Sequence, residues 1–273
     1  MNLFKLFRSI KPFVKPYKWL VFLTLILTLI GSLMAQVNAV VLDRTVDAVN
    51  ALKPDLICLT GDLADGTAIS ASGVAYLTGD LADGSVDKIG PYLEPIKRLR
   101  ARDGVFACTG NHEYYHDYPE WMEKFYGRLD NVRFLANECV FPRKGLALAG
   151  IPDEVGLMRF GIDNGKEWWR SYDDATNGEF RVLMVHQPRN TMMYVRECDV
   201  RLQLSGHTHG GIAPLLSTLV KLHNGGYVRG LYPVSIDGYL YVSPGCGQWA
   251  GFPMRFFNDS EIKVFKLKRA GAK

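Results

Sequence analysis

Four short motifs place oxygen and nitrogen donors directly after apolar runs of this sequence. Gly61-Asp62 and its repeat Gly79-Asp80 each set a carboxylate beside a glycine, and Gly110-Asn111-His112 sets a carboxamide beside an imidazole. His186 ends the run RVLMVH, and GHTHGG at residues 206–211 carries two more imidazoles. Mixed carboxylate, amide and imidazole donors suit Mn²⁺, Fe or Zn²⁺ rather than Ca²⁺, which prefers oxygen alone. The motifs therefore predict a transition-metal centre.

The spacing of the donors indicates phosphoryl chemistry. His207 and His209 are two residues apart, and in an extended segment such residues point to the same face, so both are expected to reach one metal cluster. Two divalent ions about 3.5–4 Å apart can clamp a phosphoryl oxygen and lower the pKa of a bridging water. His112, which follows the ligand Asn111, is predicted to be the general acid for the leaving oxygen, or to stabilise charge on the phosphate.

Each motif alone has an ordinary structural explanation. A Gly-Asp pair is usually a turn, and a histidine at a strand end is more often hydrogen-bonded than a ligand. His116 and His223 are interpreted in that structural way. Four such motifs in one chain would require four coincidences, so together they favour a site over a structural explanation.

The apolar runs that precede these motifs predict the elements that position them. Runs at 55–62, 104–111, 181–186 and 200–207 are typical of buried strands that end in a polar residue, while 239–247 and 261–267 alternate as β-strands. Residues 86–101 and 117–129 suit helices. Strands with polar tips, separated by helices, predict a layered α/β fold with its site at the carboxyl ends of the strands.

The motifs, with the closing run YVSPGCGQWAGFPMRFFNDSEI, resemble the calcineurin-like metallophosphoesterases, and most closely their bacterial membrane-linked branch. The resemblance runs from about residue 46 to 267. It implies a four-layer α/β/β/α sandwich with two central sheets, and hydrolysis of phosphomonoesters or phosphodiesters by a hydroxide that bridges two metal ions. It also implies a role for each donor: a Gly-Asp carboxylate bridges the ions, His112 is the catalytic histidine, His209 holds the first ion, and the second is held by Asn111, His186 and His207.

One part of the family pattern is missing. The family opens with a strand carrying D-x-H, which supplies an Asp and a His to the first metal, about twenty residues before residue 46. Here that region is an apolar leader, and residues 19–42 contain neither Asp nor His. The first ion would then be weakly held. The alternative function is therefore a catalytically weak, metal-binding pseudoenzyme anchored in the membrane.

A tandem repeat leaves the identity of the carboxylate ligand open. CLTGDLADG at 58–66 recurs as YLTGDLADG at 76–84, with eight of nine positions identical. In one hypothesis Asp62 stands where D-x-H stood and Asp80 bridges the ions. Against it, parallel strands need a crossover of a dozen or more residues, and the 18-residue offset must hold both strand and crossover. The favoured interpretation makes Asp62 the ligand and the second copy a surface loop, where added length costs little.

The N-terminal region predicts a membrane anchor. Residues 1–18 carry five Lys or Arg and no acidic residue, and Trp19–Leu42 carries no charge. As a helix these roughly 24 residues would reach ~36 Å, enough to cross a ~30 Å hydrocarbon core. We therefore expect one transmembrane helix within residues 1–45 and a phosphoesterase domain at 46–273. The basic residues before the span place the N-terminus inside and the domain outside the cytoplasm. The anchor also suits a lipid-linked substrate.

Residues 1–45 also resemble the first membrane helix of an ABC exporter. The chain has no G-x-x-x-x-G-K-[ST] phosphate loop, so a membrane-transport ATPase fragment is disfavoured. Of the net charge of +4, the leader holds +5 and the rest therefore −1, which gives no electrostatic footprint for nucleic acid. The five cysteines are widely spaced and odd in number, which suggests neither a disulfide framework nor a zinc ribbon.

Overall fold

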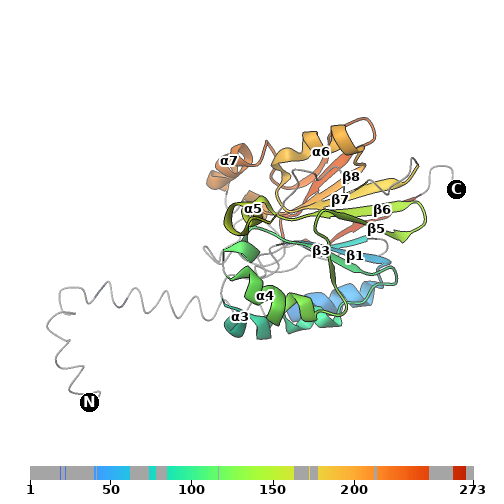
Figure 1. The fold of residues 1–273 in the computed structure, drawn as a ribbon. Coiled ribbons are helices and arrows are strands. Elements are labelled where there is room, and N and C mark those ends of the chain that lie inside the picture. Colours follow the sequence, from blue (N-terminus) through green and yellow to red (C-terminus); the bar gives the residue numbers. More distant parts are fainter. Residues whose placement is uncertain are drawn as a thin grey trace, which may run out of the picture. The chain divides into compact units, whose positions relative to one another are not determined.

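The computed structural model describes residues 19, 22, 40, 42–61, 74–77, 85–115, 117–162, 172, 178–211, 214–245 and 261–268 (Figure 1). Residues 1–37 and 38–273 form separate compact units, and the fold below is that of the second. Asp62, Asp80, His116 and most of the predicted membrane span lie outside the described residues. Within the described part of the chain, no helix is both long enough and apolar enough to span a bilayer.

Two β-sheets form the centre of the domain. The strands are β1 (Leu56–Thr60), β2 (Val74–Leu77), β3 (Val105–Cys108), β4 (Arg133–Phe134), β5 (Glu138–Arg143), β6 (Leu146–Ile151), β7 (Phe180–Val185), β8 (Leu202–Ser205), β9 (Gly230–Pro233), β10 (Tyr239–Val242) and β11 (Lys263–Phe265). The first sheet has the order β11-β2-β1-β3-β4 and is parallel except for β11. The second has the order β5-β6-β7-β8-β10-β9, with β6, β7, β8 and β10 parallel.

Helices connect and cover the strands. A helix at residues 42–52 precedes β1. The α-helices that follow are α3 (Val86–Leu93), α4 (Tyr118–Lys124), α5 (Glu154–Phe160), α6 (Thr191–Cys198) and α7 (Pro214–His223). The 3₁₀ helices are η3 (Glu94–Arg98), η4 (His112–Tyr114), η5 (Tyr126–Arg128), η7 (Pro188–Asn190) and η8 (His209–Gly211).

The alternation of side chains along the strands produces a layered structure. In β1, Ile57 and Leu59 pack with the helices on the outer face of the first sheet, while Leu56 and Cys58 face the second sheet. In β7, Val182 and Met184 belong to the core between the sheets, whereas Leu183 packs outward with Tyr194 of α6 and other residues. In Figure 1, α3 and α4 lie on one side of the sheets and α6 on the other. The predicted mixed α/β fold is confirmed.

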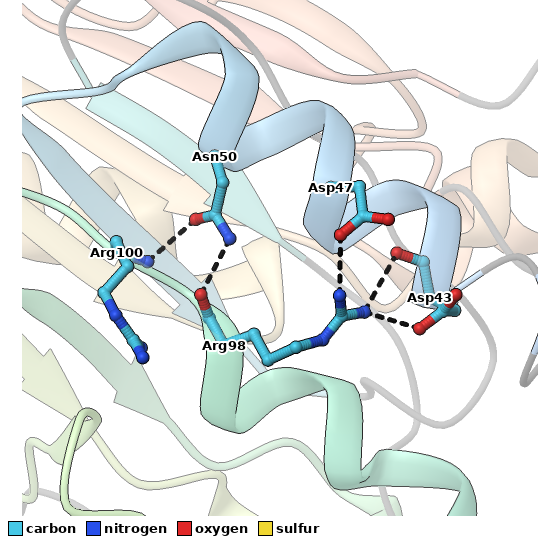
Figure 2. A network of polar contacts seen from close by, with 5 residues as sticks. All are labelled: Asp43, Asp47, Asn50, Arg98 and Arg100. Carbon is cyan, nitrogen blue, oxygen red and sulfur yellow. Dashed lines mark hydrogen bonds and ion pairs between the residues drawn. The ribbon is translucent and has the colours of Figure 1, made fainter.

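The helix at 42–52 is fixed to the first sheet by both apolar and polar contacts. Leu42, Val46 and Val49 are buried in the core beneath it. On its outer side the Arg98 guanidinium pairs with Asp47 Oδ1 at 2.7 Å and also with Asp43 (Figure 2). Exposed ion pairs are worth only about 0.2–1 kcal/mol. Burial of the apolar face therefore holds the helix, and the polar contacts set its alignment.

The two copies of the tandem repeat lie on neighbouring parallel strands. Leu56 is paired with Val74 and Leu59 with Leu77, so the strands are offset by 18 residues, the same offset as the repeat. Residues 61–73 connect them, and these 13 residues satisfy the minimum for a parallel crossover. The surface-loop interpretation of the second copy is therefore wrong for residues 74–77, and 18 residues are enough for strand and crossover.

Both predicted helices are shorter than expected. The segment 86–101 is α3 followed by η3, which begins at Glu94 and has Pro95 in its first turn. Similarly, 117–129 divides into α4 and η5 at Phe125. The sequence patterns also missed the antiparallel pair β5–β6, which turns at Gly145 with φ of 85°. In β6 the weak strand formers Ala and Gly make up three of the six residues.

Candidate metal centre

The carboxyl ends of four parallel strands converge on one region. Gly61 follows β1 and Asn111 lies shortly after β3, and these strands pair in parallel with Thr60 opposite Cys108. His186 follows β7 and His207 lies just after β8 in the facing sheet. The structure therefore brings these motifs together at the carboxyl ends of the strands, where the sequence predicted the site.

Three of the predicted ligands touch one another. Asn111 Oδ1 lies 2.9 Å from His186 Nε2 and 2.8 Å from His207 Nδ1, and the two imidazole nitrogens are 3.2 Å apart. Three donors that each lie about 2.1 Å from one ion, at right angles, would be separated by about 3.0 Å. The triangle of donor atoms thus has the size expected of three ligands to one transition ion.

The hydrogen bond behind His186 fixes its tautomer. His186 is fully buried, and its Nδ1 lies 2.8 Å from the Thr60 carbonyl, which can only accept, so Nδ1 carries the proton. A neutral His186 then presents the Nε2 lone pair to Asn111 Oδ1. Two acceptors at 2.9 Å repel unless a proton or a metal ion lies between them. A carbonyl behind a ligating imidazole is also the usual outer partner of a metal-bound histidine. The donor set therefore fits a divalent transition ion.

The GHTHGG segment is not extended. The prediction that an extended backbone points His207 and His209 to the same face is therefore wrong. His207 has φ of 69° and His209 of 46°, both in the left-handed region. Thr208 N donates to Gly206 O at 2.8 Å, which closes a γ-turn around His207. His209 begins η8 and is half-buried. The structure brings His207 to Asn111 and His186, and the role of His209 stays a prediction.

Gly61 lies against the loop that carries Asn111. Its φ is 72°, and a Cβ atom added there would lie 2.3 Å from Gly110 N and 2.5 Å from Gly110 Cα. Only glycine allows this backbone approach. The end of β1 is thus packed directly onto the backbone preceding Asn111.

The loop after β3 is held by buried polar contacts. Glu113 is fully buried, and its carboxylate accepts from Gly110 N and, at 3.4 Å, from the Tyr126 hydroxyl. Tyr114 bonds Thr109 at 2.7 Å, and burial raises its pKa, so the phenol stays neutral. The His112 ring packs edge-on against Tyr115, with centroids 4.9 Å apart. These contacts fix the backbone of the loop that carries Asn111 and His112.

A second buried network joins three strand ends. Asp153, which follows β6, accepts from Gln187 Nε2 at 2.9 and 3.1 Å and from Val155 N at 3.0 Å. The Asp153 amide donates to Thr109 Oγ1 at 3.2 Å. Gln187 is adjacent to His186, so this carboxylate ties β6, β7 and the loop after β3 together. Sequence reasoning missed Asp153, although the run GIPDE after an apolar stretch carried the same strand-tip signal.

No group of three or more His, Cys, Asp or Glu side chains able to hold a metal occurs among the described residues. The triangle has only two histidines and draws its third donor from an amide. Asp62 and Asp80, the expected carboxylates, lie outside the described residues. His223 ends α7 and is exposed.

Comparisons with known proteins identify a family. A family model described as calcineurin-like phosphoesterase matches residues 37–211, which include every predicted site residue. An uncharacterized metallophosphoesterase of Helicobacter pylori is 37% identical over 229 residues, covering 82% of this chain and 54% of that protein. A transmembrane protein with metallophosphoesterase domain from Danio rerio is 32% identical over 236 residues, covering 84% and 49%. The chain spans about half the length of these curated relatives.

Proposed function

Since the chain belongs to the calcineurin-like phosphoesterase family, we propose that it hydrolyses phosphomonoesters or phosphodiesters with two divalent metal ions at the strand ends. Members of this family use divalent ions. The observation that carries the proposal is the contact of Asn111 Oδ1, His186 Nε2 and His207 Nδ1 within 3.2 Å of one another. Mn, Fe and Zn all accept this donor set.

The order of the strands supports the proposed ligand assignment. Asn111, His186 and His207 would hold one ion, and His209 would hold the other. Asp62 would supply a carboxylate to both ions, and the packing of Gly61 on Gly110 supports this role. Asp80 follows β2, which is β1's other neighbour in the sheet. We assign Asp80 as a further carboxylate ligand in place of the absent D-x-H. This reverses the hypothesis in which Asp62 replaces D-x-H and Asp80 bridges the ions.

The protein groups contribute orientation and proton transfer. Bound divalent ions would polarise the phosphoryl oxygens and lower the pKa of the attacking water. His112 donates a proton to the leaving oxygen as the ester P–O bond breaks, and Tyr115 orients its ring. The Thr60 carbonyl keeps the His186 proton on Nδ1 and leaves Nε2 as a ligand.

We also propose a membrane-anchored enzyme with a lipid-linked phosphate ester as substrate. The uncharged run from Trp19 supports the anchor. Leu42 is 3% exposed and packs in the domain core, so the span is assigned to residues 19–39. As a helix these roughly 21 residues would reach ~32 Å, still enough to cross the hydrocarbon core. Danio rerio and Bos taurus relatives are described as transmembrane proteins with this domain.

The test is hydrolysis of an aryl phosphodiester and an aryl phosphomonoester with Mn²⁺ added and then removed by chelator. We expect His112→Ala to lower turnover by roughly 10²–10⁴-fold, the usual scale for a general acid. Its metal content should be unchanged, whereas His207→Ala should lose metal. Equal metal loss in both variants would mean that the roles are misassigned. One bound ion or none in the wild type, without turnover, would support the pseudoenzyme instead.

A further inference from the structure

Helix α5 rests on η4, which begins at His112. A Cβ atom added to Gly156 would lie 2.7 Å from Tyr114 Cζ and 2.9 Å from Tyr114 Cε1, so the backbone of α5 is in contact with a ring of η4. Asp153 caps the same helix by accepting from Val155 N at 3.0 Å. Because the contact involves the helix backbone itself, α5 is held close to η4, and side chains near Gly156 on the helix can reach it.

Arg159 lies on the side of α5 that faces η4. It follows Gly156 by three residues, and residues with that spacing are neighbours on a helix surface. Its Nη1 donates to Tyr115 O at 3.1 Å and, more weakly, to Tyr114 O at 3.4 Å, two carbonyls at the end of η4. Its guanidinium also lies over the Tyr115 ring, with Cζ 5.0 Å from the ring centroid. Within the described part of the chain, no carboxylate pairs with Arg159, so its polar contacts all go to η4 and its cap.

Tyr115 links Arg159 to the proposed general acid. Its ring packs edge-on against the His112 imidazole, with centroids 4.9 Å apart, and its backbone N donates to His112 O at 3.1 Å. Tyr115 is 42% exposed, so burial alone does not fix the ring that contacts His112. A planar guanidinium can stack on an aromatic ring and donate to nearby acceptors at the same time. Arg159 does both to Tyr115 and therefore restrains its ring and its backbone together.

We propose that Arg159 is a positioning residue for His112. Arg159 holds the Tyr115 ring, and the Tyr115 ring holds the imidazole in the orientation from which it protonates the leaving oxygen. The proposal rests on the proposed role of His112 and goes beyond it, because α5 carries none of the residues predicted for the site. Since Arg159 acts through Tyr115, its removal disturbs the proton transfer and leaves the triangle of donor atoms intact.

The first test compares two diesters that differ only in their leaving group. Methyl phenyl phosphate releases phenol, a poor leaving group that needs a proton, whereas methyl 2,4-dinitrophenyl phosphate releases a phenolate that leaves without one. Arg159→Ala should lower kcat for the phenyl ester by roughly 10–10²-fold, the scale of a misplaced catalytic group. The kcat for the dinitrophenyl ester, both KM values and the metal content should not change.

Two further variants separate positioning from a general loss of structure. Arg159→Lys keeps a cation that can lie over the Tyr115 ring but lacks the planar fork, so it should recover part of the lost kcat. In a protein that already carries His112→Ala, Arg159→Ala should lower kcat no further, because residues that act as a unit are not additive.

Arg100→Ala is the matched control. Arg100 is exposed, and its Nη1 also donates to two carbonyls beside the end of a 3₁₀ helix, Lys97 O at 2.9 Å and Leu99 O at 3.0 Å. It precedes β3, whose other end leads to Asn111. Loss of such carbonyl bonds away from His112 should leave the hydrolysis of both esters unchanged.

A spectroscopic measurement tests the same contact without turnover. In Zn²⁺-loaded protein with ¹³C-labelled histidine, the His112 Cε1–H signal is identified by its loss in His112→Ala. That signal carries the ring-current shift of Tyr115, and Arg159→Ala should move it toward the position of a free histidine.

Each alternative gives a different result. An unmoved His112 signal, an unchanged kcat for the phenyl ester, or equal losses for the two esters would overturn the positioning role. A higher KM with unchanged kcat would assign Arg159 to substrate binding and overturn it as well. A wild type that hydrolyses neither ester would overturn the proposed function, and the His112 signal would still decide whether Arg159 positions the ring.

Discussion

Gly61→Ala tests whether the close approach of two strand ends builds the site. The added Cβ would lie 2.3 Å from Gly110 N, 2.5 Å from Gly110 Cα and 2.8 Å from Thr109 C. All three atoms are backbone, so relief requires a shift of about 1 Å in a strand end. The left-handed conformation adds about 1–2 kcal/mol for a residue with a side chain, and overpacking adds about 1–3 kcal/mol. We expect a loss of about 2–5 kcal/mol in the free energy of unfolding.

Gly161→Ala is the matched control. Gly161 has φ of 65°, but nothing lies within 4 Å of its added Cβ, so only the conformational cost of about 1–2 kcal/mol applies. At about 2–4 °C per kcal/mol for a domain of this size, thermal unfolding should show a fall in Tm of about 4–20 °C for Gly61→Ala and about 2–8 °C for the control. Metal content should fall only in Gly61→Ala. Equal Tm shifts and full metal content in both variants would refute the argument.

Two further predictions concern the carboxylates. Asp153→Asn should lower the free energy of unfolding by about 1–3 kcal/mol, because an amide N–H₂ then faces the Gln187 N–H₂. In a protein that already carries Asp153→Asn, Gln187→Ala should lower the free energy of unfolding little further. Denaturant titration of the single and double variants measures both effects. Asp62→Asn should abolish most metal binding and Asp80→Asn should remove part of it, as metal analysis would show. If Asp80→Asn leaves metal content unchanged, β2 has only a structural role in the sheet. If neither variant loses metal, the two-metal assignment is wrong.

The site could be located from the sequence because its strands are buried on both faces. Such strands appear as continuous apolar runs, and the polar residue after each run is easily seen. Asn111, His186 and His207 were predicted as ligands of one ion, and the structure places their donor atoms together. The fold class followed from the same runs.

The supporting atoms could not be found in this way. Thr60 acts through its carbonyl, and every residue has one, so no side-chain pattern marks it. The strand at 74–77 is four residues long and follows the small-residue run TAISAS, so its pairing with β1 decides its conformation more than its own propensity. Gly150 in β6 weakened the strand signal, yet a Cβ there would lie 2.5 Å from Leu135 Cβ, so close packing requires the glycine.

His207 and His209 both lie in the left-handed region, and backbone hydrogen bonds order the loop that carries them. A side chain in that region costs about 1–2 kcal/mol, and His207 and His209 both adopt it. Such strain persists only where the surroundings fix the backbone. Here Gly206 N donates to His186 O at 2.8 Å, and Gly211 N donates to Thr208 O at 2.8 Å. These bonds join the end of β8 to the end of β7 and close the turn around Thr208. The backbone therefore sets His207 against His186.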